Sequence, residues 1–445
     1  MLSRTPVLAT LFRRAFASSF LKNVLIVVQG NAASVVIMVI ALPILSRLFP
    51  PSAFGVFQSA LSLMSVGLVA ASLRYETPIL TAKRLTLRPI VSLNFVLNLV
   101  TSGIAAVLCI AAYVFFPERL GAVKSVLFLV PFWFLSAGLL QTGTYIALRQ
   151  KGFAQVSRAK MTQAIGYAAL GIVVAKLGWA AAAGLVLADM SGRAFAAASL
   201  FIRGRKLLLT DWSSRSARAM KVAAIRYRDY PRISLISATV NTLGGMMTPV
   251  LMLMCFSSTV AGQFALVDRS VGTALGVIAQ SVYQVYLSTF ANSLQSGTDE
   301  PLRRFRQTIL IQFLIGIVPA IVLAIVFPWL FVLVFGGEWH MAGEFGRILM
   351  PLYLVGFSVS PVNMTLMVLE NQRTQLAWDC FRLTGVVTIW STVAVLHVSP
   401  YFAMAIHSAF GCTAYLVYML MADRAVRRRV QNGSARVAPP TAVEA

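Results

Sequence analysis

Long apolar segments separated by short polar loops make up most of the chain. Most segments contain the roughly 20 apolar residues that a helix needs to cross about 30 Å of hydrocarbon. Their expected ranges are 22–46, 53–73, 90–116, 125–148, 161–179, 180–202, 233–254, 264–290, 308–335, 348–369, 383–398 and 400–422. The pattern predicts an all-α integral membrane protein with twelve transmembrane helices.

The basic residues concentrate on one side of the predicted membrane. If the N-terminus lies inside, 31 of the 38 Lys and Arg residues fall on that side. The opposite loops carry only Arg47, Arg119, Lys124, Lys176 and Arg347. Short loops rich in Lys and Arg stay cytoplasmic. We therefore expect a multi-pass membrane protein with both termini inside.

The composition agrees with a membrane protein. Hydrophobic residues make up 58% of the chain and charged residues 12%, against about 25% charged in a soluble domain. The net charge of +24 is expected to set topology and attract anionic headgroups, and no nucleic-acid partner is expected. No phosphate loop, catalytic constellation or zinc-ligand spacing is found. We predict no enzyme, no metal and no cofactor.

The two halves of the chain repeat each other. Pro43 and Gly55-Val-Phe57 in the first half match Pro249 and Gly262-Gln-Phe264 in the second, at offsets of 206 and 207 residues. Each half holds six predicted helices, so both enter the membrane from the same face, as in transporters that rock two lobes about a central site. The predicted divisions are an N-terminal lobe (1–202), a cytoplasmic linker (203–232), a C-terminal lobe (233–422) and a basic tail (423–445).

Several motifs resemble one family when taken in their order and spacing. They are Leu45-Ser-Arg-Leu-Phe-Pro-Pro-Ser-Ala-Phe-Gly-Val-Phe57, Leu73-Arg-Tyr-Glu76, Arg149-Gln-Lys-Gly-Phe153, Tyr227-Arg-Asp-Tyr-Pro231 and Ala261-Gly-Gln-Phe-Ala265. This set is similar to bacterial polysaccharide-export flippases, the Wzx-like oligosaccharide flippases of the multidrug/oligosaccharidyl-lipid/polysaccharide superfamily. The charged pair Asp268-Arg269 departs from the pattern, since a small residue and a nearby proline are expected there.

The resemblance implies a fold shared with multidrug exporters, in which two six-helix lobes flank a V-shaped central cavity. It also implies a cargo, undecaprenyl-diphosphate-linked oligosaccharide, moved from the inner to the outer leaflet by ion-coupled alternating access. Such export serves O-antigen, exopolysaccharide or capsule synthesis. The partners implied are the lipid-linked cargo, membrane lipids, a polysaccharide polymerase and a chain-length regulator.

A diphosphate crossing the membrane needs inward-facing cations, and Arg suits it because the planar guanidinium donates two hydrogen bonds at once. Asp189 and Arg193 are four residues apart on one helical face near mid-membrane. Asp268 and Arg269 lie one turn inside the eighth segment from its outer end. Either pair is a cargo or coupling site, or a purely structural ion pair or gate.

The remaining candidates line the predicted path. Arg74 and Glu76, at the inner mouth, are expected to receive the headgroup or close a gate, although Arg74 also suits the membrane interface. One face of the eighth segment carries the polar side chains of Gln280, Tyr283 and Gln284. These side chains suit either a wall that faces sugars or a hydrogen-bonded contact between helices. His407 is a candidate for proton coupling. The intramembrane amides Asn94, Asn98, Gln141 and Asn241 suit either the path or hydrogen bonds between helices.

Two alternatives stay open. A drug or metabolite antiporter of the related multidrug-extrusion type would need a more acidic cavity to hold cations. A non-transporting scaffold for polysaccharide synthesis would need exposed partner motifs, for which only the 203–232 stretch and the Arg424–Arg429 cluster offer room. Genomic neighbours would discriminate: glycosyltransferases favour the flippase, and a drug-resistance regulator favours the antiporter.

The topology is testable by cysteine labelling. In a background without the four natural cysteines, a cysteine at position 340 should react with an impermeant reagent added outside intact cells. Cysteines at 212 and 435 should react only after permeabilisation, because the basic loops hold them inside. The reverse labelling pattern would contradict the predicted orientation.

Overall fold

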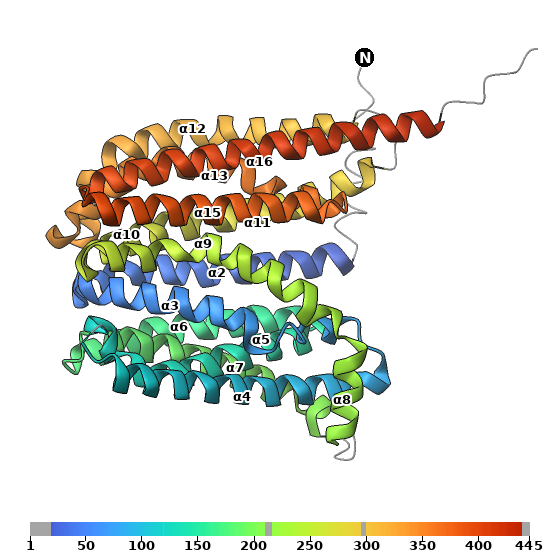
Figure 1. Ribbon diagram of the computed structural model, residues 1–445, viewed down its shortest axis with the longest axis horizontal. Coiled ribbons are helices and arrows are strands. Elements are labelled where there is room, and N and C mark those ends of the chain that lie inside the picture. The colour runs from blue at the N-terminus through green and yellow to red at the C-terminus, as the bar shows by residue number, and fades with distance from the viewer. Residues whose placement is uncertain (1–18, 119, 210–215, 295–299, 438–445) are drawn as a thin grey trace, which may run out of the picture. The chain divides into compact units, whose positions relative to one another are not determined.

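The computed structural model describes residues 19–118, 120–209, 216–294 and 300–437, and every regular element in these ranges is helical (Figure 1). The chain divides into two compact units, Met1–Thr239 and Val240–Ala445. The division falls inside the helix Leu235–Cys255. The bounds predicted for the linker (203–232) and the basic tail (423–445) stay predictions. The central cavity between the lobes also stays a prediction.

The described residues of unit 1 form seven long or medium helices joined by short turns. They are α2 (Ser19–Leu48), α3 (Pro51–Ala71), α4 (Arg84–Phe115), α5 (Val130–Arg149), α6 (Phe153–Lys176), α7 (Ala182–Leu209) and α8 (Ala217–Arg226). The short turns are η1 (Thr77–Leu80), η2 (Gly121–Ser125), η3 (Leu127–Leu129) and η5 (Tyr230–Ser234). The start of α3 follows from Pro51, which needs no amide donor in a first helical turn.

Aromatic stacking and close helix packing form the core of unit 1. The ring of Phe57 on α3 stacks on Trp133 of α5 and on Tyr167 of α6, with centroids 5.8 and 6.1 Å apart. A Cβ added at Gly166 of α6 would lie 2.9 Å from the Cα of Gly192 on α7. Only residues without side chains allow these two backbones to approach so closely.

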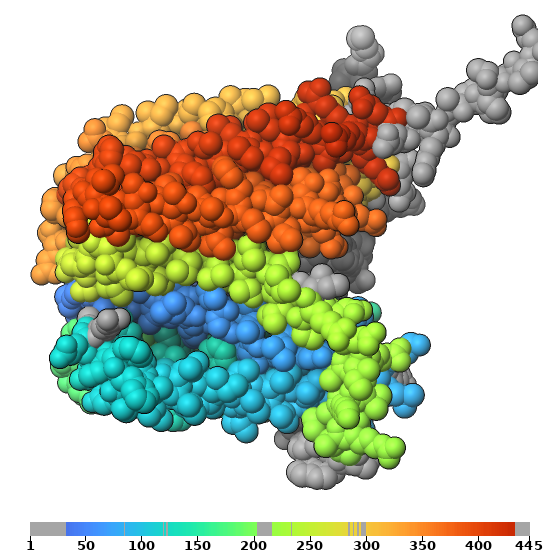
Figure 2. All heavy atoms as spheres, in the orientation of Figure 1, coloured from blue at the N-terminus to red at the C-terminus, as the bar shows by residue number. Residues whose placement is uncertain are grey.

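The predicted linker contains a helix that belongs to unit 1. Helix α8 packs on α4, as Figure 2 shows from one side. The hydroxyl of Tyr75 donates to the carbonyl of Ala224 at 3.0 Å, and the hydroxyls of Thr86 and Tyr227 lie 3.2 Å apart. These contacts tie the stretch after α7 to the same end of the unit as the 72–80 turn.

Unit 2 holds the remaining helices. They are α9 (Leu235–Cys255), α10 (Ser258–Val267), the π-helix η6 (Asp268–Gly272), α11 (Thr273–Ser293), α12 (Glu300–Phe335), η7 (Gly337–Trp339), α13 (His340–Val359), η8 (Ser360–Val362), α14 (Thr365–Val368), α15 (Gln372–Leu396) and α16 (Pro400–Val437). In the core, Trp378 packs edge-on against Tyr418, and its indole N–H donates to the carbonyl of Ala414 at 2.8 Å. These contacts hold α15 against α16.

The repeated motifs occupy matching elements in the two units. Pro43 and Pro249 lie inside α2 and α9, near their C-terminal ends. Phe57 in α3 and Phe264 in α10 are both buried. The tenth segment is not one helix, because α13 gives way at Val359 to the short turn that contains Pro361. Proline removes a helical donor, which explains the break.

Among the described residues, nine helices are long and apolar enough to cross a membrane. Helix α6, which carries Arg158 and Lys160, is not among the nine, and neither is the eighth segment, which η6 divides. The described part of α2 contributes the shorter apolar stretch Ala33–Leu48. The fold class is confirmed as a helical membrane protein, and the count of twelve spans stays a prediction.

Several predicted helix starts and ends are wrong on the side of the predicted membrane where the basic residues concentrate: there the helices extend beyond the apolar segments. Helices begin at Phe153, Glu300 and Gln372, where the apolar pattern predicts 161, 308 and 383. Helix α16 continues to Val437, well beyond 422. Lys and Arg are good helix formers, so a helix continues where its apolar stretch has ended.

The close approach of α6 and α7 gives a stability prediction. A Cβ at Gly192 would lie 2.7 Å from the carbonyl oxygen of Gln163 and 3.0 Å from the amide of Tyr167. Gly192→Ala should therefore lower the melting temperature of the purified protein, with an overpacking cost of about 1–3 kcal/mol. Gly103→Ala is the control, because its Cβ would meet no described atom within 4 Å. Equal melting temperatures for the two variants would refute the packing argument.

Candidate functional site

The turn after α3 places Arg74 and Glu76 together. Leu73 and Arg74 adopt left-handed backbone angles, with φ of 50° and 64°, which turns the chain sharply where α3 ends. The Glu76 carboxylate is fully buried. It accepts from the hydroxyl of Ser72 and from the side-chain amide of Gln141 at 3.0 Å. Arg74 Nη1 lies 3.6 Å from Glu76 Oε1 and is the more exposed partner.

Neighbouring amides extend this polar cluster between helices. Asn94 on α4 donates to the carbonyl of Tyr75 at 2.9 Å, and Asn98 donates to the hydroxyl of Thr142 at 3.1 Å. Both asparagines are buried. The sequence left two roles open for these amides: lining the transport path or forming hydrogen bonds between helices. The observed contacts are of the second kind. Arg149 has a similar structural contact, donating through Nη2 to the carbonyl of Ala82 at 2.7 Å.

Asp189 and Arg193 form the ion pair that their spacing predicts. The Nε atom of Arg193 lies 2.5 Å from Asp189 Oδ2, and the same oxygen accepts from the indole N–H of Trp133 at 2.6 Å. Asp189 is buried, whereas the Arg193 side chain is 17% exposed. In the described part of the chain, Arg193 makes this one hydrogen bond through Nε, so its two outer amino groups remain available to a ligand.

In unit 2, two of the residues that the sequence analysis proposed to face sugars, Gln280 and Tyr283, line one pocket with polar groups. Gln280 and Tyr283 of α11 line a cavity of about 420 Å³, together with Ser360 and Asn363 from the turn after α13. The Oδ1 atom of Asn363 is buried and accepts no hydrogen bond from the described residues. Gln284 belongs to α11 by its backbone, and its side chain lies outside the described residues.

Asp268 and Arg269 lie in a π-helical turn that the sequence did not predict. The turn η6 joins α10 to α11. A Cβ added at Gly272 would lie 3.1 Å from Asp268 Oδ1 and 3.8 Å from Tyr353 on α13. Asp268 therefore lies beside Gly272 and a helix other than its own. Turns of this kind are frequent at functional sites.

His407 lies on α16 against Trp390 of α15, with ring centroids 6.0 Å apart. Its Nδ1 atom is buried and has no hydrogen bond to the described residues. The candidates within each unit thus form separate groups. Searched among the described residues, no three acidic, histidine or cysteine side chains converge as metal ligands.

The structure reveals a charged cluster around Asp379 that the sequence analysis missed. The buried Asp379 carboxylate accepts from the amide of Asn241 at 2.8 Å and lies 3.8 Å from Arg382 Nη2. The Arg382 guanidinium stacks on Trp378, with its carbon 4.7 Å from the ring centroid. The apolar pattern put Asp379 and Arg382 in a cytoplasmic loop, but both lie inside α15. Their three-residue spacing was the available signal.

Together, these features define a class of protein: a two-unit helical membrane protein with ionisable side chains paired inside its helices, as is typical of transporters. Residues 44–344 match the family described as "Polysaccharide biosynthesis protein". The chain belongs to this family, which confirms the resemblance drawn from its motifs.

Solved structures with low sequence identity share the fold. "Lipid II flippase MurJ, inward closed conformation" is 13% identical, with a TM-score of 0.66 over 91% of this chain and 90% of that one. An inward-facing multidrug resistance MATE transporter of the MOP superfamily is 14% identical, with a TM-score of 0.60 over 93% and 96%. A MOP superfamily transporter from Pyrococcus furiosus, also 14% identical, has a TM-score of 0.53 over 93% and 96%. No curated protein matches the chain.

The buried carboxylate of Glu76 gives a prediction for stability. Glu76→Gln keeps the size of the side chain but removes its charge and replaces one of its two acceptor oxygens, which face Ser72 on one side and Gln141 and Arg74 on the other, with an NH2 donor. A buried group left unsatisfied costs about 1–3 kcal/mol, so the melting temperature should fall. Glu344→Gln, in an exposed pair with Arg347, is the control and should change it little. A smaller effect at Glu76 than at Glu344 would contradict the assigned contacts.

Proposed function

We propose that this protein moves an undecaprenyl-diphosphate-linked oligosaccharide from the inner to the outer leaflet of the bacterial cytoplasmic membrane. The two lobes alternate access to a central cavity, and the lipid tail stays in the bilayer. The exported unit serves O-antigen, exopolysaccharide or capsule synthesis. Membership of the polysaccharide biosynthesis family and the fold shared with a lipid II flippase support this function.

One observation carries the choice of an anionic cargo. Three acidic side chains are buried in the part of the chain that the structure describes, each pairs with a nearby arginine, and in every pair the arginine is the more exposed partner. The side-chain exposures are 26% for Arg74 against 1% for Glu76, 17% for Arg193 against 7% for Asp189, and 20% for Arg382 against 2% for Asp379. In each pair, therefore, the carboxylate lies inside the protein and the guanidinium group lies nearer its surface. A cavity that held organic cations would need the opposite arrangement.

Arg193 is our principal diphosphate ligand. Asp189 fixes the guanidinium through Nε, and the two outer amino groups point away from that bond. A pair of parallel N–H donors matches two oxygens of a phosphate. Arg74, held beside Glu76, receives the headgroup at the inner mouth or closes that mouth. Arg269 is the corresponding ligand near the outer end of unit 2.

The polar pocket in unit 2 suits the sugars. Gln280 and Tyr283 offer an amide and a hydroxyl, and the open Oδ1 of Asn363 is a further acceptor. Sugar hydroxyls both donate and accept, so this mixture fits them, and Gln284 extends the same helix. Ion coupling or gating is assigned to Asp189, Asp268 and His407. A polysaccharide polymerase and a chain-length regulator are the protein partners that we propose for this role.

The experiment that tests this function is translocation of a labelled undecaprenyl-diphosphate oligosaccharide in proteoliposomes. Arg193→Gln should reduce the rate about tenfold or more, because it removes charge-assisted hydrogen bonds to the diphosphate. Arg347→Gln, which changes an exposed arginine, should leave the rate unchanged. Equal rates for both variants at matched reconstitution would argue against a cationic site. Counterflow of an organic cation without lipid translocation would support the antiporter instead.

A double substitution separates the ligand role of Arg193 from its structural role. Asp189→Asn alone leaves an intramembrane cation without its partner, which can cost several kcal/mol. The combination of Asp189→Asn with Arg193→Gln should restore membrane abundance relative to Asp189→Asn, but not translocation. Restoration of both abundance and translocation would show that the pair is only structural.

A further inference from the structure

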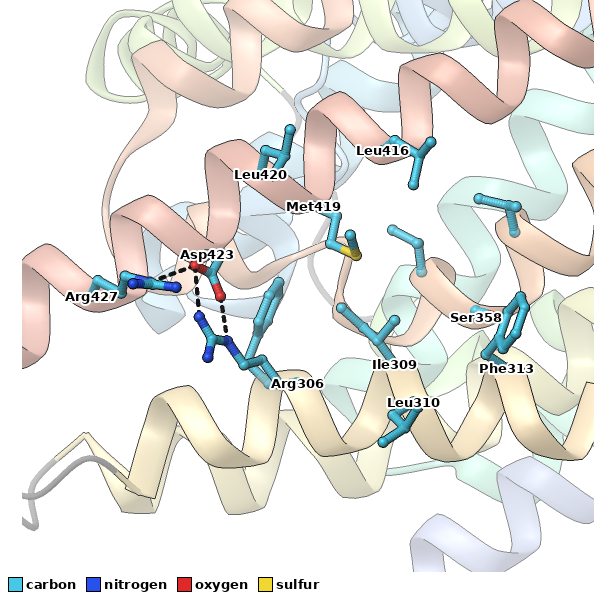
Figure 3. A pocket seen from close by; sticks show the side chains of 13 residues that line it. Arg306, Ile309, Leu310, Phe313, Ser358, Leu416, Met419, Leu420, Asp423 and Arg427 are labelled. Carbon is cyan, nitrogen blue, oxygen red and sulfur yellow. Dashed lines mark hydrogen bonds and ion pairs between the residues drawn. The ribbon is translucent and has the colours of Figure 1, made fainter.

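An apolar groove with a charged end runs along unit 2, and none of its lining residues is among those assigned to the cargo. It has a volume of about 500 Å³ and lies among α12, α13 and α16 (Figure 3). Its walls include Ile309, Leu310 and Phe313 from α12, and Leu416, Met419 and Leu420 from α16. The volume is within the roughly 300–1,000 Å³ typical of small-ligand sites.

Three charged side chains close one end of this groove. Asp423 accepts from Arg306 through Nε at 2.7 Å and Nη2 at 3.2 Å, and from Arg427 through Nε at 2.7 Å. Two guanidinium groups share one carboxylate, which leaves a net positive charge. The Asp423 side chain is 17% exposed, whereas those of Arg306 and Arg427 are 49% and 53% exposed. The cations therefore present their remaining amino groups outward.

The groove opens on a surface suited to lipid. Leu310, Leu416 and Leu420 are all exposed on helices long and apolar enough to cross a membrane. From Arg306 to Phe313 the apolar wall extends seven residues along α12, or roughly 10 Å at about 1.5 Å per residue. The arrangement thus has one cationic end and an apolar trough two helical turns long, complementary to a phosphate that carries a hydrocarbon chain.

We propose that this groove binds one anionic glycerophospholipid of the surrounding membrane, with its phosphate on Arg306 and Arg427 and an acyl chain against Leu310, Phe313 and Leu416. The predicted topology puts the charged end at the cytoplasmic leaflet, whose anionic lipids attract basic side chains there. Asp423 holds both guanidinium groups in place before the lipid arrives. The site is independent of the proposed cargo.

Native mass spectrometry of the full-length protein in detergent tests the proposal, with phosphatidylglycerol and phosphatidylcholine as probes. Phosphatidylglycerol should bind more tightly than phosphatidylcholine of the same chain length. Arg306→Gln combined with Arg427→Gln should weaken phosphatidylglycerol binding about tenfold or more, the loss expected when charge-assisted hydrogen bonds are removed. The control is Arg303→Gln with Arg424→Gln, which removes two exposed charges from the same helices outside the groove and should keep binding unchanged.

Met419→Trp provides a second test that removes no charge, and it keeps the proposal testable if the double variant does not fold. The larger side chain fills the trough, so phosphatidylglycerol binding should fall although all arginines remain. Equal losses in the groove and control double variants, or unchanged binding in Met419→Trp, would overturn the proposal. So would competition by inorganic phosphate alone, or a preference for polyprenyl phosphate over phosphatidylglycerol.

Discussion

Charge inside a membrane helix must be paired, and this requirement shapes both units. An unpaired carboxylate in a dry environment is costly, and each buried acid among the described residues has an arginine within four residues of it, in a helix or in the turn after α3. The pairs are Arg74–Glu76, Asp189–Arg193 and Asp379–Arg382. In each case the carboxylate also accepts from a side chain on another helix, so the charge fixes how helices pack as well as where the cation points.

The same pairs give the protein an electrostatic direction. Because the acids are buried and the arginines are more exposed, we propose that a ligand meets positive charge first. This polarity is the physical basis for preferring a diphosphate-linked cargo over an organic cation. Multidrug transporters share the fold, so the architecture alone does not choose between them; the side chains lining each unit do.

The basic helix ends serve a second purpose. Helices α12 and α16 extend past their apolar stretches and bring Arg306, Asp423 and Arg427 together beside an apolar trough. Read from the sequence, these residues are part of the charge bias that sets topology. Once folded, they also form a site whose shape and charge match an anionic lipid. In the proposed site, arginines from two helices that help to orient the chain also bind a lipid of the same membrane.

The sequence by itself determined the helical membrane class, the internal repeat and the family, because apolar length, charge bias and motif order are properties of the linear chain. It also determined the Asp189–Arg193 pair, since four-residue spacing alone puts two side chains on one helical face. Only the tertiary structure decided that Trp133 completes that pair, that Asp379 and Arg382 lie inside a helix, and that Asp268 begins a π-helical turn. These depend on contacts between helices far apart in the chain and on hydrogen bonds that continue past the apolar stretch, neither of which hydropathy records.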